Sequence, residues 1–433
     1  MSVPHILIVG GGIGGLALAQ NLKKRGISFT LFERDASPAI RAQGYRIRIA
    51  GGGVEGLKEC LDDELFNLES MFPMGPGGRP GVGQGPSWLK MGGSGRRGGR
   101  INKQLRPAPI LRQKRRIRRK REIVAQSQQE EKLVALDKSY PVDRTMLRNI
   151  LLLGQEENVK FSKCFTHYEV SAVGVTAFFD DGTSEEGTLL VGADGTASLV
   201  RRQLLPNVHY LDTGSRVIYG KTPISEELVA QFPADPLKGT SIIQDQRPFT
   251  LFMEPVRFPK DAAMESKGRL PRTDDYIYWV LGGNAEAVGL SDEEFHNLSE
   301  KDASDLTLKL TTHWDPSFKA MFELQHIAQC APLRLISAKR ERPEWTPSPK
   351  VILIGDAIHA MMPAGGSGAN CALADASHLA RHISERGISE ETMACFVDQM
   401  FDYALPAIDG SAQAGKKLLG FKDWEGAKEV TFN

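Results

Sequence analysis

The chain has 433 residues, of which 41% are hydrophobic and 25% are charged, and its formal net charge is +1. This is the composition of an ordinary soluble protein with room for two domains, and no apolar run approaches the ~20 residues that span a bilayer. The first predicted strand begins too close to Met1 for a signal peptide. Five scattered cysteines without C-x-x-C spacing indicate a reducing compartment without disulfides or structural zinc. We therefore expect a cytoplasmic protein without a metal site.

The chain opens on a strand and a glycine-rich turn. Residues 9–35 read VGGGIGGLALAQNLKKRGISFTLFERD and follow a short apolar run at 6–9. The run predicts a buried parallel strand, and the residues after the turn predict a helix that ends near Gly26. Between them lies a G-x-G-x-x-G motif made of Gly10, Gly12 and Gly15. In such a motif the first glycine permits the tight turn, the second lets the backbone approach a pyrophosphate, and the third lets the helix pack closely.

A second predicted strand at 29–32 ends at Glu33, whose carboxylate is placed to accept hydrogen bonds from a ribose. Strand, glycine turn, helix, strand and acid together predict a dinucleotide-binding unit, with the phosphates at the helix N-terminus. The motif serves NAD, NADP and FAD alike, so this unit alone leaves the cofactor open. A further helix is predicted from Val54 to Leu68.

Residues 71–121 differ from everything around them. They hold fifteen Lys or Arg and no Asp or Glu, and eleven glycines fall within 71–100. A segment of this composition cannot bury enough apolar surface to offset its loss of chain entropy, so we predict that it is disordered.

Beyond this segment the predicted secondary structure changes from a helix and two strands to an antiparallel sheet, and then to a buried parallel strand with helices. Asp143 is the predicted N-cap of an amphipathic helix, and a strand, an Asp-Gly turn and a buried strand follow up to residue 192. From about 205 to 345 several stretches alternate in the manner of an antiparallel sheet. Residues 351–357 then return to the buried parallel type, and the rest is predicted to be helical to the end.

Residues 351–376 read VILIGDAIHAMMPAGGSGANCALADA and contain a second candidate ligand site. A buried strand that ends in Gly355-Asp356 places a carboxylate at the carboxyl edge of the sheet, where α/β proteins bind ligands. The loop from Pro363 to Gly368 begins a helix whose amides point at the same crevice and stabilise negative charge by about 0.3–2 kcal/mol. A reduced flavin develops such a charge and a nicotinamide does not, so this segment favours FAD.

Three stretches together resemble the class A FAD-dependent monooxygenases, the aromatic hydroxylases related to para-hydroxybenzoate and salicylate hydroxylase. They are GGGIGG with Glu33, VGADGTASLVR at 191–201, and the stretch that begins at Gly355-Asp356. Their order and spacing match the family over residues 5–65 and 140–385. We refer to the second and third stretches as the DG and GD segments.

The resemblance implies an α/β fold, in which a Rossmann-like FAD-binding domain carries an inserted β-rich substrate domain with an antiparallel sheet, and C-terminal helices. The expected parts are the FAD-binding domain at 1–70, 126–204 and 346–433, the Gly/Arg-rich segment at 71–125 and the substrate domain at 205–345. The expected enzyme holds FAD without a covalent bond and uses NADPH or NADH and O2 to hydroxylate or epoxidise an electron-rich aromatic or polyketide-derived small molecule in secondary metabolism. It has no stable nucleic-acid partner and is a monomer or homodimer.

The resemblance also implies roles for single residues at the cofactor. Asp356 hydrogen-bonds the ribitol chain of FAD, and Gly368 and Ala369 offer backbone amides to the flavin ring. Arg144 contacts the phosphate or ribityl region of FAD, and Asp194 lies close to both FAD and the nicotinamide cofactor.

Other residues are placed by the resemblance near the reaction itself. Gly44 and Tyr45 fall where the family's chain passes near the isoalloxazine ring. Arg201 and, as its companion, Tyr219 are the candidate catalytic residues, with a structural ion-pair role for Arg201 as the open alternative. His359 fits a buried, hydrogen-bonded histidine better than a base. The expected lining of the substrate pocket comes from the sheet, at Phe249, Phe252, Met253, Tyr278 and Trp279, whereas Met361 and Met362 are expected to pack in the core.

Several alternatives remain open on sequence grounds. A flavin-dependent halogenase would share the first motif, but the chain lacks a W-x-W-x-I-P stretch. A flavin reductase or dehydrogenase of the same fold would share all three motifs. The run KRRIRRKR at 114–121 would suit nucleic acid, but a solvated basic tail or a nuclear-import signal would look the same.

The Gly/Arg-rich stretch is a departure from the family, whose members have ordered strands between the first helices and the arginine equivalent to Arg144. One hypothesis is that part of 71–121 is non-native coding, such as a retained intron or a shifted frame, which would make this chain an inactive family member. Sequencing the mature transcript tests it, because continuous coding through 71–121 contradicts the hypothesis.

Overall fold

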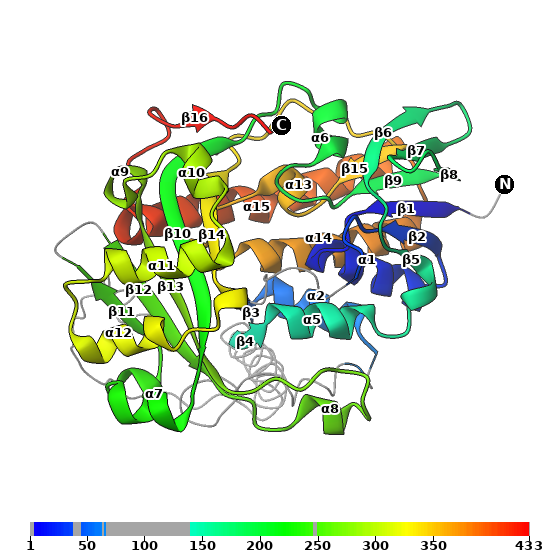
Figure 1. The fold of residues 1–433 in the computed structure, drawn as a ribbon. Coiled ribbons are helices and arrows are strands. Elements are labelled where there is room, and N and C mark those ends of the chain that lie inside the picture. The colour runs from blue at the N-terminus through cyan, green and yellow to red at the C-terminus, as the bar shows by residue number, and fades with distance from the viewer. Residues whose placement is uncertain (1–3, 38–44, 63–64, 66–138, 246–248, 433) are drawn as a thin grey trace, which may run out of the picture.

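The structure is a computed structural model that describes residues 4–37, 45–62, 65, 139–245 and 249–432 (Figure 1). The predicted disorder at 71–121 and the cofactor-binding prediction for Gly44 lie outside these residues.

The first layer is a five-stranded parallel sheet with the order β15-β9-β1-β2-β5. Its strands are β1 (His5–Val9), β2 (Ser28–Phe32), β5 (Val159–Lys160), β9 (Leu189–Gly192) and β15 (Val351–Leu353). Strands β9 and β15 are buried along their whole length and β1 along nearly all of it, which is why these stretches are continuously apolar rather than alternating. One sheet thus collects strands from three distant parts of the sequence.

Helices pack around this sheet and share its core. They are α1 (Ile13–Lys24), α2 (Gly52–Cys60), α5 (Arg144–Leu152), α6 (Leu199–Leu204), α14 (Gly368–Arg386) and α15 (Glu390–Leu418), with the short elements η3 (Glu156–Asn158), α13 (Asp356–His359) and η6 (Pro363–Gly365). Asp143 caps α5 as predicted, since its side chain accepts a hydrogen bond from the Met146 amide. The prediction of one continuous helix from Val54 to Leu68 is wrong, because α2 ends at Cys60 and Leu61 has an extended backbone.

The second large layer is an antiparallel sheet with the order β11-β12-β13-β10-β14. Its strands are β10 (Leu211–Pro223), β11 (Ser241–Gln244), β12 (Phe249–Val256), β13 (Tyr276–Asn284) and β14 (Ala331–Ser337). Around it lie α7 (Glu226–Gln231), η4 (Pro236–Lys238), α9 (Ala285–Val288), α10 (Asp292–His296), α11 (Glu300–Leu310), α12 (Pro316–Glu323) and η5 (Ile327–Gln329). The short helix α8 (Ala262–Glu265) instead packs Ala262 into the core around the parallel sheet. A second core forms between this sheet and helices on one of its faces.

The C-terminal region corrects one prediction. The chain is not helical to its end, because β16 (Lys428–Glu429) pairs with β10 antiparallel to it and becomes the sixth strand of the large sheet. The predicted fold class, an α/β Rossmann-like fold with a β-rich antiparallel sheet and C-terminal helices, is confirmed.

Two smaller ribbons complete the fold. In the first, β6 (Phe165–Val170), β7 (Val175–Phe179) and β8 (Ser184–Gly187) form a three-stranded antiparallel sheet. The stretch predicted as one strand after the Asp-Gly turn is therefore two strands, β8 and β9. In the second, β3 (Arg46–Ala50) pairs antiparallel with β4 (Ser139–Asp143), and Figure 1 shows this pair between the two large sheets.

Two further findings bear on the sequence predictions. All five cysteines are free thiols. Within the described ranges the structure holds no helix of the length and apolarity that crossing a membrane requires.

Candidate functional site

The three motif glycines in the turn after β1 differ in how much room their surroundings leave for a side chain. Gly10 has φ +109°, and a Cβ there would lie 2.4 Å from the Ala193 carbonyl oxygen. A Cβ on Gly15 would lie 2.0 Å from the carbonyl oxygen of Gly10, so α1 packs against the turn at a distance that only glycine allows. At Gly12 a Cβ would meet no atom of the described residues within 4 Å. The turn is thus tight at its two ends and open in the middle.

The open middle of the turn is also where α1 begins. Gly12 is the N-cap residue, no side chain in the described part of the chain caps this end, and the first turn contains no acidic residue. The amides of a helix N-terminus carry partial positive charge and attract phosphate. The geometry is therefore that of a backbone cradle for an anion.

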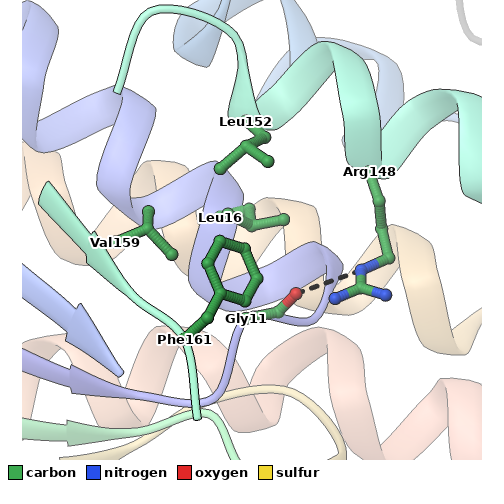
Figure 2. Close-up of a pocket in the computed structure, with 6 residues that line it drawn as sticks. All are labelled: Gly11, Leu16, Arg148, Leu152, Val159 and Phe161. Carbon is green, nitrogen blue, oxygen red and sulfur yellow. Dashed lines mark hydrogen bonds between the residues drawn. The ribbon is translucent and has the colours of Figure 1, made fainter. Parts of the chain in front are cut away.

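Glu33 lies beside this cradle and is held in place by it. Its Oε2 accepts a hydrogen bond from the Gly11 amide at 2.8 Å, and its Oε1 accepts one from the Asp35 amide at 3.0 Å. Arg148 reaches from α5 to the same place, where its Nε donates to the Gly11 carbonyl at 3.1 Å (Figure 2). Its Nη2 lies 3.8 Å from Glu33 Oε2. The cradle, the acid and this arginine therefore form one connected unit.

Sequence reasoning missed Arg148, although a signal was present. It lies four residues after Arg144 on α5, which places both arginines on one helix face. The cavity beside it, lined by the apolar side chains in Figure 2, measures about 10 Å³. That is room for a single water molecule at most, so Arg148 acts on the glycine turn and not on a ligand in that cavity.

The GD segment presents a carboxylate at the carboxyl edge of the parallel sheet, as predicted. The Asp356 side chain is exposed, while its backbone carbonyl accepts a hydrogen bond from the hydroxyl of Tyr210 at 2.8 Å. A Cβ on Gly368 would lie 3.8 Å from Asp356 Oδ1, which places the N-terminus of α14 directly beside this carboxylate. No side chain caps α14 either. Asp356, Gly368 and Ala369 are therefore brought together at one edge.

A buried network fixes the backbone of the GD segment. Asp375 of α14 is fully buried, and its Oδ2 accepts hydrogen bonds from the Gly355 amide and from His359 Nε2, both at 2.7 Å. Its Oδ1 accepts one from the hydroxyl of Tyr403 on α15 at 2.5 Å. His359 is itself fully buried, in agreement with its prediction as a buried, hydrogen-bonded histidine.

The network makes one contribution to stability depend on pH. Burial alone would lower the pKa of His359, but the adjoining Asp375 carboxylate outweighs it, and the pKa is raised above 6.5. A raised folded-state pKa stabilises the protein fully below the unfolded-state pKa, and this stabilisation is lost as pH rises through the folded-state value. We expect the difference in unfolding free energy between wild type and His359→Asn to be largest below about pH 6.5 and to shrink at higher pH. Denaturant titrations at a series of pH values measure it, and a difference that grows with pH contradicts the expectation.

In the DG segment, the predicted site residues Asp194 and Arg201 form hydrogen bonds that fix the local backbone. Asp194 accepts hydrogen bonds from Ser198 Oγ at 2.5 Å and from the Leu199 amide at 2.8 Å, at the start of α6. Arg201 is only 1% exposed. It donates to the carbonyls of Thr196 and Ala357, each at 3.0 Å, and its guanidinium lies 3.8 Å from the ring centre of Tyr210. These contacts tie the DG segment to the GD segment, so the geometry favours a positioning role for Arg201. Its predicted catalytic role stays a prediction.

Three predicted residues meet where the β3–β4 pair approaches the large sheet. The rings of Tyr45 and Tyr219 pack edge to face with centroids 5.2 Å apart, and the Arg144 guanidinium lies 5.3 Å from the centre of the Tyr45 ring. The Arg144 amide donates to the Tyr45 carbonyl at 3.1 Å. Burial raises the pKa of the Tyr219 hydroxyl, so Tyr219 keeps its proton at neutral pH.

The five residues expected to line a substrate pocket separate onto two faces of the large sheet, because side chains alternate along a strand. Phe249, Met253 and Trp279 belong to the core beneath the helices. Phe252 and Tyr278 lie on the opposite face with their ring centroids 6.1 Å apart. Strand pairing puts Tyr219 opposite Val280, and thus on the same face as Phe252 and Tyr278.

Met361 and Met362 behave as expected. Met362 is buried within a core between β10, β14 and α15, and Met361 packs at the edge of a neighbouring cluster.

Comparison with known proteins places the chain by sequence and by fold. A family model described as a NAD(P)-binding Rossmann-like domain matches residues 8–58, and one described as an FAD binding domain matches residues 328–389. The dual O-methyltransferase/FAD-dependent monooxygenase elcB of Phaeosphaeria nodorum is 34% identical over 89% of this chain and 41% of its own length. The FAD-dependent monooxygenase thnD of Trichoderma harzianum is 26% identical over 90% of this chain and 85% of its own.

A solved structure agrees with these sequence matches. That of a candidate FAD-containing monooxygenase from Photorhabdus luminescens superposes with a TM-score of 0.70 at 27% identity, and covers 97% of this chain and 100% of that one. The chain spans less than half the length of the dual-function relatives it matches. The first matched region contains the glycine cradle, and the second contains the start of the GD segment. By sequence and by fold, the chain is similar to FAD-dependent monooxygenases.

Proposed function

We propose that this protein is an FAD-dependent monooxygenase that uses NAD(P)H and O2 to hydroxylate or epoxidise an electron-rich small molecule of aromatic or polyketide-derived type. The observation that carries the proposal is that two uncapped helix N-termini, those of α1 and α14, accompany Asp356 at the carboxyl side of one parallel sheet. FAD, when bound, would supply the redox chemistry that couples NAD(P)H oxidation to oxygen transfer. The protein's own share is binding, orientation and exclusion of water.

The described residues fit FAD at both ends. The open space at Gly12 and the amides of α1 suit the pyrophosphate, and Glu33 beside them suits a ribose. At the other end, Asp356 would hydrogen-bond the ribitol chain, and the amides at Gly368 and Ala369 would face the ring system, where negative charge develops on reduction. Asp194 has both carboxylate oxygens occupied by α6, so we assign it to holding the DG segment near the cofactor.

The substrate would lie against the face of the large sheet that carries Tyr219, Phe252 and Tyr278. Tyr45 and Arg144 join this aromatic surface to the cofactor end of the site. Tyr219 would act as a hydrogen-bonding group, because its raised pKa keeps the hydroxyl protonated. The cytoplasmic location and the monomeric or dimeric state stay predictions.

Replacing Asp356 tests where the cofactor binds. Asp356→Ala should weaken FAD binding about ten- to a hundredfold, because a hydrogen bond to a charged group contributes roughly 1.5–3 kcal/mol. The melting temperature of the apoprotein should stay unchanged, since the side chain is exposed. Quenching of flavin fluorescence on titration gives the affinity. Asp402→Ala, an exposed aspartate on α15, is the matched control. Equal affinity in wild type and Asp356→Ala would place the cofactor elsewhere.

The spectrum of the purified protein tests the wider proposal. A flavin absorbance that is released by denaturation indicates non-covalent FAD, and a colourless protein that FAD cannot reconstitute contradicts the proposal. A flavin reductase or dehydrogenase of this fold is separated by oxygen accounting. A monooxygenase couples oxygen uptake to hydroxylation of a phenol, whereas a reductase oxidises NAD(P)H without forming a hydroxylated product.

A further inference from the structure

Two arginines and one glutamate meet where β3 faces β12. Glu254 of β12 has a side chain only 1% exposed, and it forms ion pairs with Arg46 and with Arg48, the latter at 3.0 Å. The two arginines are two residues apart on β3 and share one face of the strand, while Ile49 on the other face packs into the core around the parallel sheet. The cluster therefore joins the cofactor half of the molecule to the substrate sheet.

The charges in this cluster do not balance. Two guanidinium groups share a single carboxylate, and the Arg46 side chain is itself only 9% exposed. The Nε of Arg46 is buried and has no hydrogen-bond partner among the described residues. Burial, with a smaller effect from Arg48, lowers the pKa of Arg46 to about 9. A buried cation without full compensation is unfavourable, so an additional anion would be stabilised here.

The position of the cluster says which anion would reach it. Arg46 lies 5.7 Å from the ring centre of Phe252, on the sheet face that also carries Tyr278. Glu254 is paired in register with Tyr278 across the two strands. This is the aromatic surface against which the proposed substrate would lie, and Tyr45 links it to Arg144. An anion next to Arg46 would therefore belong to a molecule whose rings pack on these aromatic side chains.

We propose that Arg46 binds an anionic oxygen substituent, a carboxylate or an ionised phenol, on the aromatic substrate. The inference rests on the proposed function, because it assigns the substrate class of the same site. Arg46 contributes the buried charge, its ion pair with Glu254 holds the side chain in place, and Phe252 and Tyr278 contact the rings. A purely structural ion triad that only ties β3 to β12 is the alternative.

Binding of a matched pair of probes distinguishes an anion-binding Arg46 from a purely structural ion triad. Isothermal titration calorimetry of the purified full chain with 2-naphthoate and 2-naphthamide compares a carboxylate with a neutral group of nearly the same shape. Wild type should bind the acid about ten- to a hundredfold more tightly than the amide, as expected for a hydrogen bond to a charged group. Arg46→Gln should abolish this preference, and Arg46→Lys should keep part of it, because a lysine retains the charge but not the planar fork. Arg340→Gln, at an exposed pair with Asp409, is the control and should keep the full preference.

Three results would overturn the proposal. They are a wild type that binds both probes equally, a wild type that binds neither, and an Arg46→Gln variant that keeps the preference for the acid. A structural triad alone would lower the melting temperature of Arg46→Gln and weaken both probes in equal proportion, which leaves the ratio of affinities unchanged. Because calorimetry measures the probes and absorbance measures FAD, failure of this inference and failure of the proposed function are seen separately.

Discussion

Asp375→Ala should lower the unfolding free energy by about 3–5 kcal/mol, the range for removing one partner from a buried charged network. Its carboxylate accepts hydrogen bonds from the Gly355 amide, His359 Nε2 and the Tyr403 hydroxyl, and the first two donors would remain buried without this partner. Because the Gly355 amide anchors the backbone just before Asp356, the variant should also lose FAD affinity. Denaturant unfolding and flavin titration measure the two effects.

Tyr403→Phe is the matched control for that experiment. It removes one donor from the same carboxylate and leaves the ring in place, so the expected loss is only about 0.5–1.5 kcal/mol. Asp356 should then keep its position, and FAD affinity should stay close to that of wild type. An Asp375→Ala variant no less stable than Tyr403→Phe would show that the network does not hold the GD segment.

Much of the cofactor end could be predicted because its signals are local. β1 ends at Val9, the tight turn follows at once, and α1 begins at Ile13, while the acid follows at the end of the next strand. The GD segment has a looser version of the pattern, because α13 and η6 lie between the strand that ends at Leu353 and the helix that begins at Gly368. In both places the chemistry depends on backbone geometry, which glycine spacing reveals directly.

The substrate end could be predicted only in part, because its residues meet through long-range pairing. Phe252 and Met253 are neighbours in the sequence and similar in hydropathy, yet one faces the aromatic surface and the other the core. Only the register with β13 decides which is which. In the same way, Arg46 and Glu254 lie on strands from different parts of the chain, and no spacing rule connects them.

Arg201 shows a different limit. An arginine after the DG segment is visible in the sequence, but its partners are the backbone carbonyls of Thr196 and Ala357, which carry no side-chain signature. The same holds for Tyr210, whose hydroxyl binds the backbone of Asp356. Contacts to the main chain are set by the fold alone, so positioning residues of this kind are found only once the fold is known.

The glycine cradle gives the sharpest separation of stability from cofactor binding. Gly10→Ala and Gly15→Ala should each destabilise the apoprotein by about 1–3 kcal/mol or more, because the new Cβ would lie 2.4 Å and 2.0 Å from backbone oxygens that cannot move aside. Gly10 also has φ +109°, which an alanine rarely adopts. Both variants should lose FAD together with their stability, as seen in thermal unfolding with and without the cofactor.

Gly12→Ala should behave in the opposite way. Its φ of −74° suits any residue, and a Cβ there meets no atom within 4 Å, so the unfolding free energy should change by less than about 1 kcal/mol. The added methyl group would nevertheless occupy the open approach to the N-terminus of α1, and FAD affinity should fall at least about tenfold, since a pyrophosphate held by backbone amides tolerates no side chain between them. A Gly12→Ala protein that is stable and binds FAD as wild type does would mean that the phosphates do not approach the turn at its open middle. The three alanine variants thus separate the two glycines that build the turn from the one that leaves room for the cofactor.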